Sequence, residues 1–208
     1  MISTQRPGIM AVAIASLAVA VAGVSAVLAW RAWQAGVPEA PDLESGASTV
    51  QALLQLLCAV LSLVWLRRSY VHVRRAGVEG LTVGPWGAVV WWFVPLANLF
   101  LPVIAFSELR KAAIKPRDWQ AADGTVLIWL WWAFWLMSGI ANVVLWRASA
   151  SDDQDLRSVV GKASFASDLL GMPAALLFAL VVVAIDRRLQ ALPPTGVMGG
   201  TASTNVSR

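Results

Sequence analysis

Few residues in this sequence have the types and spacing that chemistry requires. His72 is the only histidine and Cys58 the only cysteine, so we expect no metal site, catalytic dyad, intramolecular disulfide or cysteine-based zinc cluster. The chain contains no glycine-rich phosphate loop and no set of nucleophile, histidine and acid. We therefore expect no catalytic, cofactor-binding or metal-binding residues. An enzymatic role stays open, but no residue argues for one.

Asp168 is the one acidic residue that can lie well inside an apolar segment. An ionisable side chain within a membrane span is a functional-site hypothesis by default, for instance a site for a proton or another cation. Asp168 also lies about one turn from the outer end of its apolar segment, so the favoured alternative is an interfacial or first-turn acid that interacts with the helix dipole. Asp186 lies beside Arg187 and Arg188 and is expected to be solvated.

The elements that would position these residues are membrane spans. The 208 residues are 58% hydrophobic and 13% charged, and a soluble domain needs more charge than this. The apolar segments 9–30, 49–66, 125–146 and 165–185 are each long enough to cross about 30 Å of hydrocarbon. The first is too long for the core of a cleaved signal peptide and is interpreted as a retained anchor. We predict an all-α, multi-pass membrane protein with one domain over residues 1–188 and a disordered tail over residues 189–208.

A fifth apolar segment, residues 84–106, contains three prolines and an asparagine. If it crossed the membrane, the 16 Lys and Arg residues would divide evenly between the two sides; if it does not cross, twelve of the 16 lie on one side. Only the second arrangement follows the positive-inside rule. We therefore favour four spans, both termini in the cytoplasm, and a proline-broken re-entrant or interfacial hairpin over residues 84–106. The alternative is a kinked fifth span.

The prolines make such a hairpin plausible. Pro95 removes a backbone donor and disfavours helix at Val94, and Pro102 is expected to break the helix again about one and a half turns later. Carbonyls freed in this way need partners inside hydrocarbon. Asn98 lies between the two breaks and can donate its side-chain amide to one of them.

The same segment carries a family resemblance. Its pattern of Pro-Trp, Trp-Trp-Phe, Pro, Asn and Pro, followed by a glutamate and a tryptophan group in the next span, resembles the uncharacterised bacterial membrane family catalogued as domain of unknown function 4328. The resemblance covers roughly residues 53–188. It implies a multi-pass protein of the bacterial plasma membrane and supplies no activity. The motif residues are Pro85, Trp86, Trp91, Trp92, Phe93, Pro95, Asn98, Pro102, Glu108, Trp131, Trp132 and Trp135.

The chain is rich in tryptophan, with twelve residues of this type. Two groups, Trp91–Trp92 and Trp129–Trp135, are expected at similar depth in the cytoplasmic leaflet. We expect them to anchor the hairpin and fill the space beside it. An aromatic box for a quaternary ammonium or a lipid headgroup is the alternative.

Polar and small residues inside the spans follow helical spacing. Gln51, Gln55, Cys58 and Ser62 share one face of the second span, and Trp135, Ser138 and Asn142 share one face of the third. We expect these side chains to form interhelical hydrogen bonds, with a polar pathway as the alternative. Faces of small residues on the first and last spans suit close helix packing or a homo-oligomer.

The basic residues flanking the hairpin segment predict the main partner. At membrane edges they indicate topology rather than nucleic-acid binding, and they are expected to contact anionic lipid headgroups. These residues are Arg67, Arg68, Arg74, Arg75, Arg110, Lys111, Lys115 and Arg117. We expect a non-enzymatic scaffold, sensor or regulator without a cofactor. The alternative is a small transporter or channel that uses Asn98 and Asp168.

Overall fold

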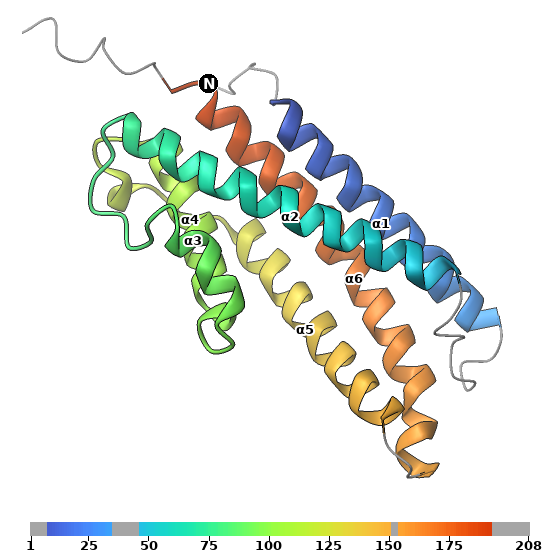
Figure 1. The fold of residues 1–208 in the computed structure, drawn as a ribbon. Coiled ribbons are helices and arrows are strands. Elements are labelled where there is room, and N and C mark those ends of the chain that lie inside the picture. Colours follow the sequence, from blue (N-terminus) through green and yellow to red (C-terminus); the bar gives the residue numbers. More distant parts are fainter. Residues whose placement is uncertain (1–7, 35–45, 151–153, 193–208) are drawn as a thin grey trace, which may run out of the picture. The chain divides into compact units, whose positions relative to one another are not determined.

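The chain is built from helices. The computed structural model describes residues 8–34, 46–150 and 154–192, and every regular element within these ranges is helical (Figure 1). In chain order the α-helices are α1 (Ile9–Gln34), α2 (Gly46–Arg75), α3 (Gly87–Val90), α4 (Leu101–Ile114), α5 (Val126–Ser149) and α6 (Gln154–Leu189). Short 3-10 helices, η1 (Trp91–Phe93), η2 (Ala97–Leu99) and η3 (Trp119–Ala121), connect them. The all-α prediction is confirmed.

Four helices have the length and composition of membrane spans. They are α1, α2, α5 and α6, and among the described residues no further helix qualifies. This confirms the predicted four spans. Each of the four helices is nevertheless longer than the apolar segment that predicted it, because helical structure continues into polar sequence.

Helix α2 shows why the apolar segment underestimates the helix. Beyond the predicted end at Leu66, buried side chains recur at Leu66, Tyr70 and Val73, which is the spacing of one helix face. This face holds the arginine-rich segment in the helix up to Arg75. The helix then ends where Gly77 adopts a φ of +83°, with its amide bonded to the Arg74 carbonyl. A left-handed glycine in this position is a common helix C-terminal signal.

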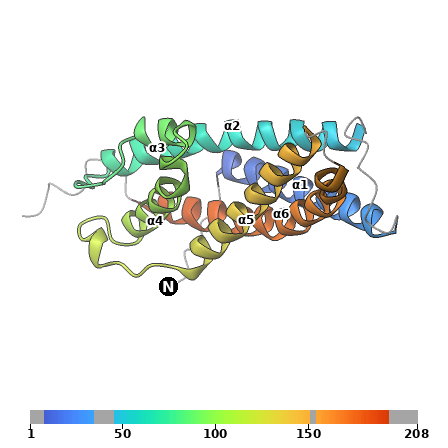
Figure 2. The same ribbon diagram turned by 90° about the horizontal axis from the view of Figure 1, so that it is seen from below.

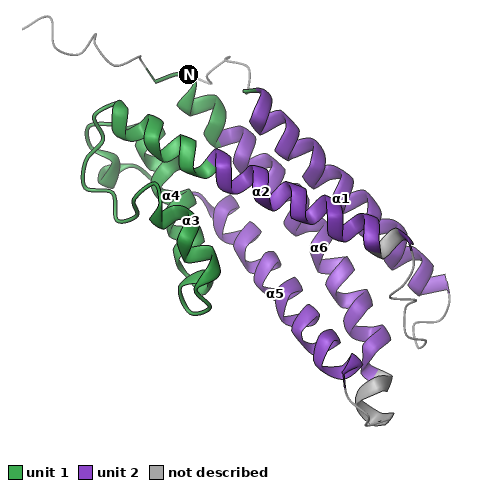
Figure 3. Cartoon of the chain, in the orientation of Figure 1, with its two compact units in different colours: residues 1–8, 66–124, 185–208 green, residues 9–65, 125–184 purple. Residues whose placement is uncertain are grey.

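The described residues form two compact units (Figure 3). Unit 1 comprises residues 1–8, 66–124 and 185–208, and unit 2 comprises residues 9–65 and 125–184. The prediction that residues 1–188 form one domain is not tested and stays a prediction. The predicted disordered tail begins at residue 189, but helix α6 includes Leu189, and residues 193–208 lie outside the described part of the chain.

Unit 2 contains the apolar lengths of the four long helices. Helix α1 buries a face of mostly small residues, including Ala11, Ala18 and Ala22. Large apolar side chains such as Leu53, Val60 and Ile140 are exposed, as expected for surfaces that face lipid. Much of the small-residue face predicted on the first span is therefore used inside the chain. A homo-oligomer through such faces stays a prediction.

Unit 1 contains the end of α2, the segment 84–106 and the end of α6. Its core joins Leu66 and Val73 of α2 with Val103, Phe106 and Leu109 of α4, all of which are buried. The buried residues of α4 recur every three to four positions, so one face of this helix is turned into the core.

The segment 84–106 forms no long helix. The chain runs out along α3 and η1, turns near Pro95 and returns through η2 into α4, and α3 contacts α4 (Figures 1 and 2). Val94 is extended, with φ −99° and ψ 111°, which confirms the predicted effect of Pro95. The predicted second break is wrong, because Pro102 lies in the first turn of α4, where the missing N–H has no intrahelical acceptor to lose. Whether this hairpin enters the membrane stays a prediction.

Candidate functional site

A buried carboxylate lies at the centre of unit 1. Glu108 of α4 is only 4% exposed. One oxygen, Oε2, accepts hydrogen bonds from the Tyr70 hydroxyl at 3.2 Å and from the Val83 amide at 3.4 Å, and Oε1 accepts from the Thr82 amide at 3.0 Å. The Tyr70 hydroxyl also lies 3.2 Å from the Ala105 carbonyl oxygen. The carboxylate thus connects α2, the segment before α3, and α4.

This arrangement fixes the base of the hairpin. A buried polar group is tolerated when hydrogen bonds satisfy it, and here the three donors come from neutral groups. Sequence reasoning identified Glu108 only as a motif residue and missed Tyr70, Thr82 and Val83. The available signal was the acid itself, since it interrupts the otherwise apolar run that opens α4.

The chain that precedes the hairpin segment and the chain that follows it are in contact. The Trp119 indole nitrogen, after the hairpin, donates to the carbonyl oxygen of Glu79, before it, at 2.9 Å. Arg110 donates to the Asp123 carbonyl oxygen at 2.8 Å. Unit 1 therefore holds together the chain that enters and the chain that leaves the segment 84–106.

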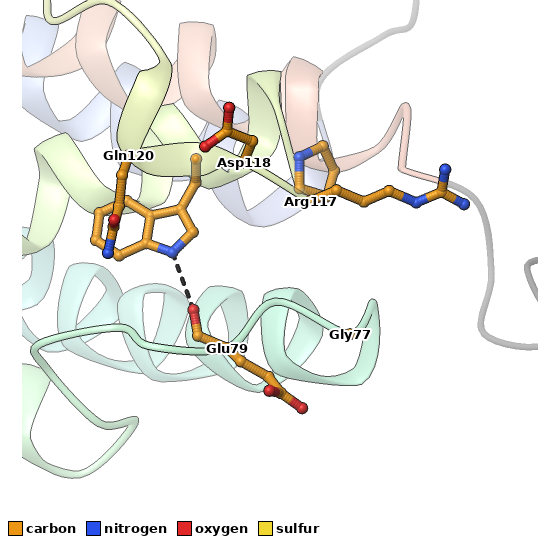
Figure 4. Close-up of a pocket in the computed structure, with 7 residues that line it drawn as sticks. Gly77, Glu79, Arg117, Asp118 and Gln120 are labelled. Atoms are coloured by element: carbon orange, nitrogen blue, oxygen red, sulfur yellow. Dashed lines mark hydrogen bonds between the residues drawn. The ribbon is translucent and has the colours of Figure 1, made fainter.

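A shallow pocket of about 390 Å³ lies at this junction. Figure 4 shows residues 77–79 on one side and the segment around Asp118 and Gln120 on the other, with Arg117 directed away. Small-molecule sites are usually enclosed and contain converging polar groups. This pocket is open to its surroundings, so we assign it no ligand.

The predicted lipid-contact residues all belong to unit 1. Its described residues include ten Lys and Arg against five Asp and Glu, a formal net charge of +5. The exposed members of the predicted set are Arg68, Arg74, Arg75, Lys115 and Arg117. Arg67, Arg110 and Lys111 are less exposed.

Two of the less exposed basic residues have structural contacts. The Arg67 guanidinium lies over the Trp86 ring, 4.4 Å from its centroid, in a cation–π contact. Burial and the neighbouring Arg188 lower the pKa of Arg110, and Asp123 partly opposes this effect. Arg110 nevertheless stays charged, because the guanidinium pKa starts far above neutral pH.

The turn of the hairpin is apolar and exposed. Phe93, Leu96 and Phe100 are 73%, 78% and 65% exposed. Asn98 lies among them, with a buried side-chain oxygen that has no hydrogen-bond partner in the described part of the chain. The predicted donation from the Asn98 amide to a freed carbonyl stays a prediction.

A separate polar layer lies within unit 2. The Gln51 side-chain amide of α2 donates to Ser25 Oγ of α1 at 2.7 Å and to Asp168 Oδ1 of α6 at 3.0 Å. On α5, Ser138 donates to the Ser167 carbonyl at 3.1 Å and the Asn142 amide to Ser167 Oγ at 2.6 Å. The prediction of interhelical hydrogen bonds is therefore confirmed for Gln51, Ser138 and Asn142. It is wrong for Ser62, which bonds the Cys58 carbonyl within α2, and Gln55 is exposed.

The structure changes the interpretation of both acids of the last span. Helix α6 begins at Gln154, about 21 Å of helix before Asp168. Asp168 is therefore no first-turn acid, and the helix-dipole interpretation is wrong. Asp186 is also not solvated: it is 6% exposed, and its Oδ2 accepts from the Gly8 amide at 2.6 Å. This bond was not predictable, because it joins residues 178 positions apart.

Three tryptophans of α5, Trp131, Trp132 and Trp135, form a packed cluster in unit 2, whereas Trp129 is 59% exposed. Trp132 is stacked on Trp135 with ring centroids 4.6 Å apart, and Trp131 contacts Phe178 at 5.2 Å. Trp131 and Trp132 are buried. Their rings fill space between helices, which favours the packing interpretation over the aromatic box. That Trp91 and Trp92 pack beside this cluster stays a prediction.

Comparison with known proteins gives one match. Residues 37–187 match the sequence model of a family described as a domain of unknown function, DUF4328. No curated protein and no solved structure matches the chain.

Proposed function

The chain belongs to the DUF4328 family, and from its geometry we propose that it is a non-enzymatic protein of the bacterial plasma membrane that senses or organises lipid at the cytoplasmic surface. Unit 1 is the part that does this. Its apolar hairpin turn enters the cytoplasmic leaflet, and its exposed basic residues bind anionic headgroups.

One observation carries this proposal: the hydrogen bond from Trp119 to the Glu79 carbonyl, 2.9 Å long. A segment that crossed the bilayer would separate these two residues by about 30 Å. Their contact supports a chain that returns to the side it left. The outgoing helical part, residues 87–93, is also short, about 10–14 Å, and reaches into one leaflet only.

The orientation follows from charge. With the hairpin turning back, both arginine-rich segments and Arg187–Arg188 lie on one side, and unit 1 contains all of them. The positive-inside rule assigns that side to the cytoplasm. Both termini are then cytoplasmic as well, since four spans return the chain to the side where it began.

Cysteine accessibility tests the topology. In a Cys58→Ala background, single cysteines replace Gln34, Ala76 and Ala121, and intact cells receive a membrane-impermeant maleimide. We expect Gln34→Cys to react in intact cells and the other two to react only after the cells are opened. Reaction of Ala121→Cys from outside, with Ala76→Cys protected, would show that the segment crosses and would overturn the proposal.

Lipid retention tests the function. In the full chain, the five exposed residues Arg68, Arg74, Arg75, Lys115 and Arg117 are replaced by glutamine, and binding of fluorescent phosphatidylglycerol to the detergent-solubilised protein is measured. Each basic residue near an anionic surface contributes about 1 kcal/mol, so we expect retention to fall at least about tenfold. Binding of phosphatidylcholine should not change.

The matched control changes the basic residues at the other end of the long helices. Glutamine at Arg31, Arg147 and Lys162 removes charge from unit 2 and should leave phosphatidylglycerol retention as it was. Equal losses per charge removed in the two variants would mean that the effect follows net charge alone. That result would contradict a headgroup site in unit 1.

Passage of a small ion is a second candidate function. The observation that favours it is the polar layer around Asp168, which draws side chains from four helices of unit 2. Intramembrane acids are common on ion pathways.

A further inference from the structure

Polar groups from four helices of unit 2 form one layer that includes the Asp168 carboxylate. Gln51 connects Asp168 to Ser25, and Gly171 of α6 lies where an added Cβ would be 3.6 Å from Ser138 Oγ and 3.8 Å from Ser25 Oγ. The glycine therefore brings two hydroxyls from α1 and α5 close to α6, one turn after Asp168. This convergence exceeds what helix packing alone requires, since apolar small residues pack equally well.

The backbone of α6 adds a further acceptor beside the acid. Pro173 lies inside the helix and has no N–H, so the Leu169 carbonyl lacks its usual donor four residues on. Leu169 directly follows Asp168. The helix continues through Pro173, and a backbone carbonyl freed inside a membrane span is an oxygen that can coordinate a small cation.

The carboxylate has no cationic partner of its own. Among the described side chains Asp168 accepts from the neutral Gln51 amide alone. The charged groups at this end of the neighbouring helices are Arg31 of α1, Arg147 of α5 and Lys162 of α6, and none of them forms an ion pair with Asp168 in the described structure. A lone ionised carboxylate among apolar helices is costly and is usually neutralised.

We propose that Asp168 binds a monovalent cation, a proton or Na⁺, within this oxygen-rich layer. One bound positive charge neutralises the single carboxylate. Gln51, which is also bonded to Ser25, holds this carboxylate in place between α1, α2 and α6. The inference rests on the second candidate function only in part, since a transporter needs such a site but a site need not transport.

Carbodiimide labelling of the full chain tests the site. Dicyclohexylcarbodiimide takes up the proton of a carboxylic acid and the carboxylate oxygen adds to its carbon, so it marks acids that are protonated in apolar surroundings. Peptide mass spectrometry then gives the labelling rate of Asp168. We expect this rate to fall about tenfold for each pH unit above its midpoint.

Parallel reactions in NaCl and in choline chloride distinguish the two cations. Slower labelling in NaCl than in choline at the same pH means that Na⁺ competes with the proton. Equal labelling means that the proton alone is bound. Both results support the site.

Two variants control the experiment. Asp168→Asn keeps an acceptor for Gln51 and should lose the label and the pH dependence of thermal unfolding that this acid contributes. Ser149→Ala removes a side-chain hydrogen bond of α5 outside this polar layer, leaves Asp168 and the layer in place and should keep the parent labelling profile.

The contrary result is also defined. If Asp168 is labelled no faster than the exposed Asp118 at any pH, and Asp168→Asn unfolds with the parent's dependence on pH and Na⁺, the site is overturned. Flux into reconstituted vesicles is measured separately. Binding without flux removes the transport candidate and keeps the site, and neither result affects the lipid proposal.

Discussion

Replacement of Glu108 by alanine should lower the free energy of unfolding by about 3–5 kcal/mol. The change removes a buried acceptor of three hydrogen bonds and leaves the Thr82 and Val83 amides without it. Each unsatisfied buried donor costs about 1–3 kcal/mol, so the two orphaned amides together account for about 2–6 kcal/mol, a range that contains the expected loss. Unfolding of the purified full chain in denaturing detergent measures the loss.

Hydrogen exchange locates the effect. In Glu108→Ala the amides of Thr82 and Val83 should exchange at least about tenfold faster, whereas amides in the middle of α5 should not change. Ser107→Ala is the matched control, since it alters the adjacent side chain of α4 and leaves the carboxylate intact. Unchanged exchange at both amides would mean that Glu108 does not hold the base of the hairpin.

Tyr70→Phe should have a smaller effect, about 1 kcal/mol, because it removes one neutral donor and retains the ring in the core. The two changes should not be additive, since they remove the same hydrogen bond. A double variant that costs the full sum would show that Tyr70 and Glu108 act independently.

The spans were predictable because their cause is local. About 20 consecutive apolar residues are enough to make a membrane helix, whatever surrounds them. The extended Val94 was predictable for the same reason, since the ring of Pro95 acts on its immediate neighbour.

What the sequence did not reveal depends on distant partners. Helix α2 continues to Arg75 because Tyr70 and Val73 are buried in the core of unit 1. The arginines around them lower the hydropathy of this segment, so the sequence did not indicate the burial. The carboxylates of Glu108 and Asp186 bond groups 25 to 178 positions away. A hydropathy profile detects neither buried carboxylate, because it assigns every Asp and Glu the value of an acid exposed to water.

The polar layer around Asp168 was predictable in part. The helical spacing of Gln51 and Cys58 predicted a face turned towards other helices, and both do bond other helices. Which atoms they meet was not predictable, because it depends on the rotation of α1 and α6. The prediction that Asp168 lies in the first turn of its helix was wrong for a simpler reason. The apolar segment begins 11 residues after the helix does.

The hairpin turn gives the second large expected effect. Phe93, Leu96 and Phe100 are exposed, so if water surrounds them, aspartates in their place change stability by less than about 0.5 kcal/mol each. Inside hydrocarbon each aspartate costs about 2.5–3.5 kcal/mol at mid-depth. Since the proposed hairpin is shallow, we expect a combined cost of a few kcal/mol for the triple variant, enough to expel the turn from the bilayer.

A fluorescent label on Ala97→Cys reports where the turn lies. In reconstituted protein with the natural turn, lipids with brominated acyl chains should quench the label, and aqueous iodide should not. In the triple aspartate variant aqueous iodide should quench the label, and the brominated lipids should not. The control variant Phe93→Leu, Phe100→Leu keeps the turn apolar and should behave as the parent does. If iodide quenches the parent as well as the triple variant, the turn lies in water, and unit 1 contacts the membrane through its basic residues alone.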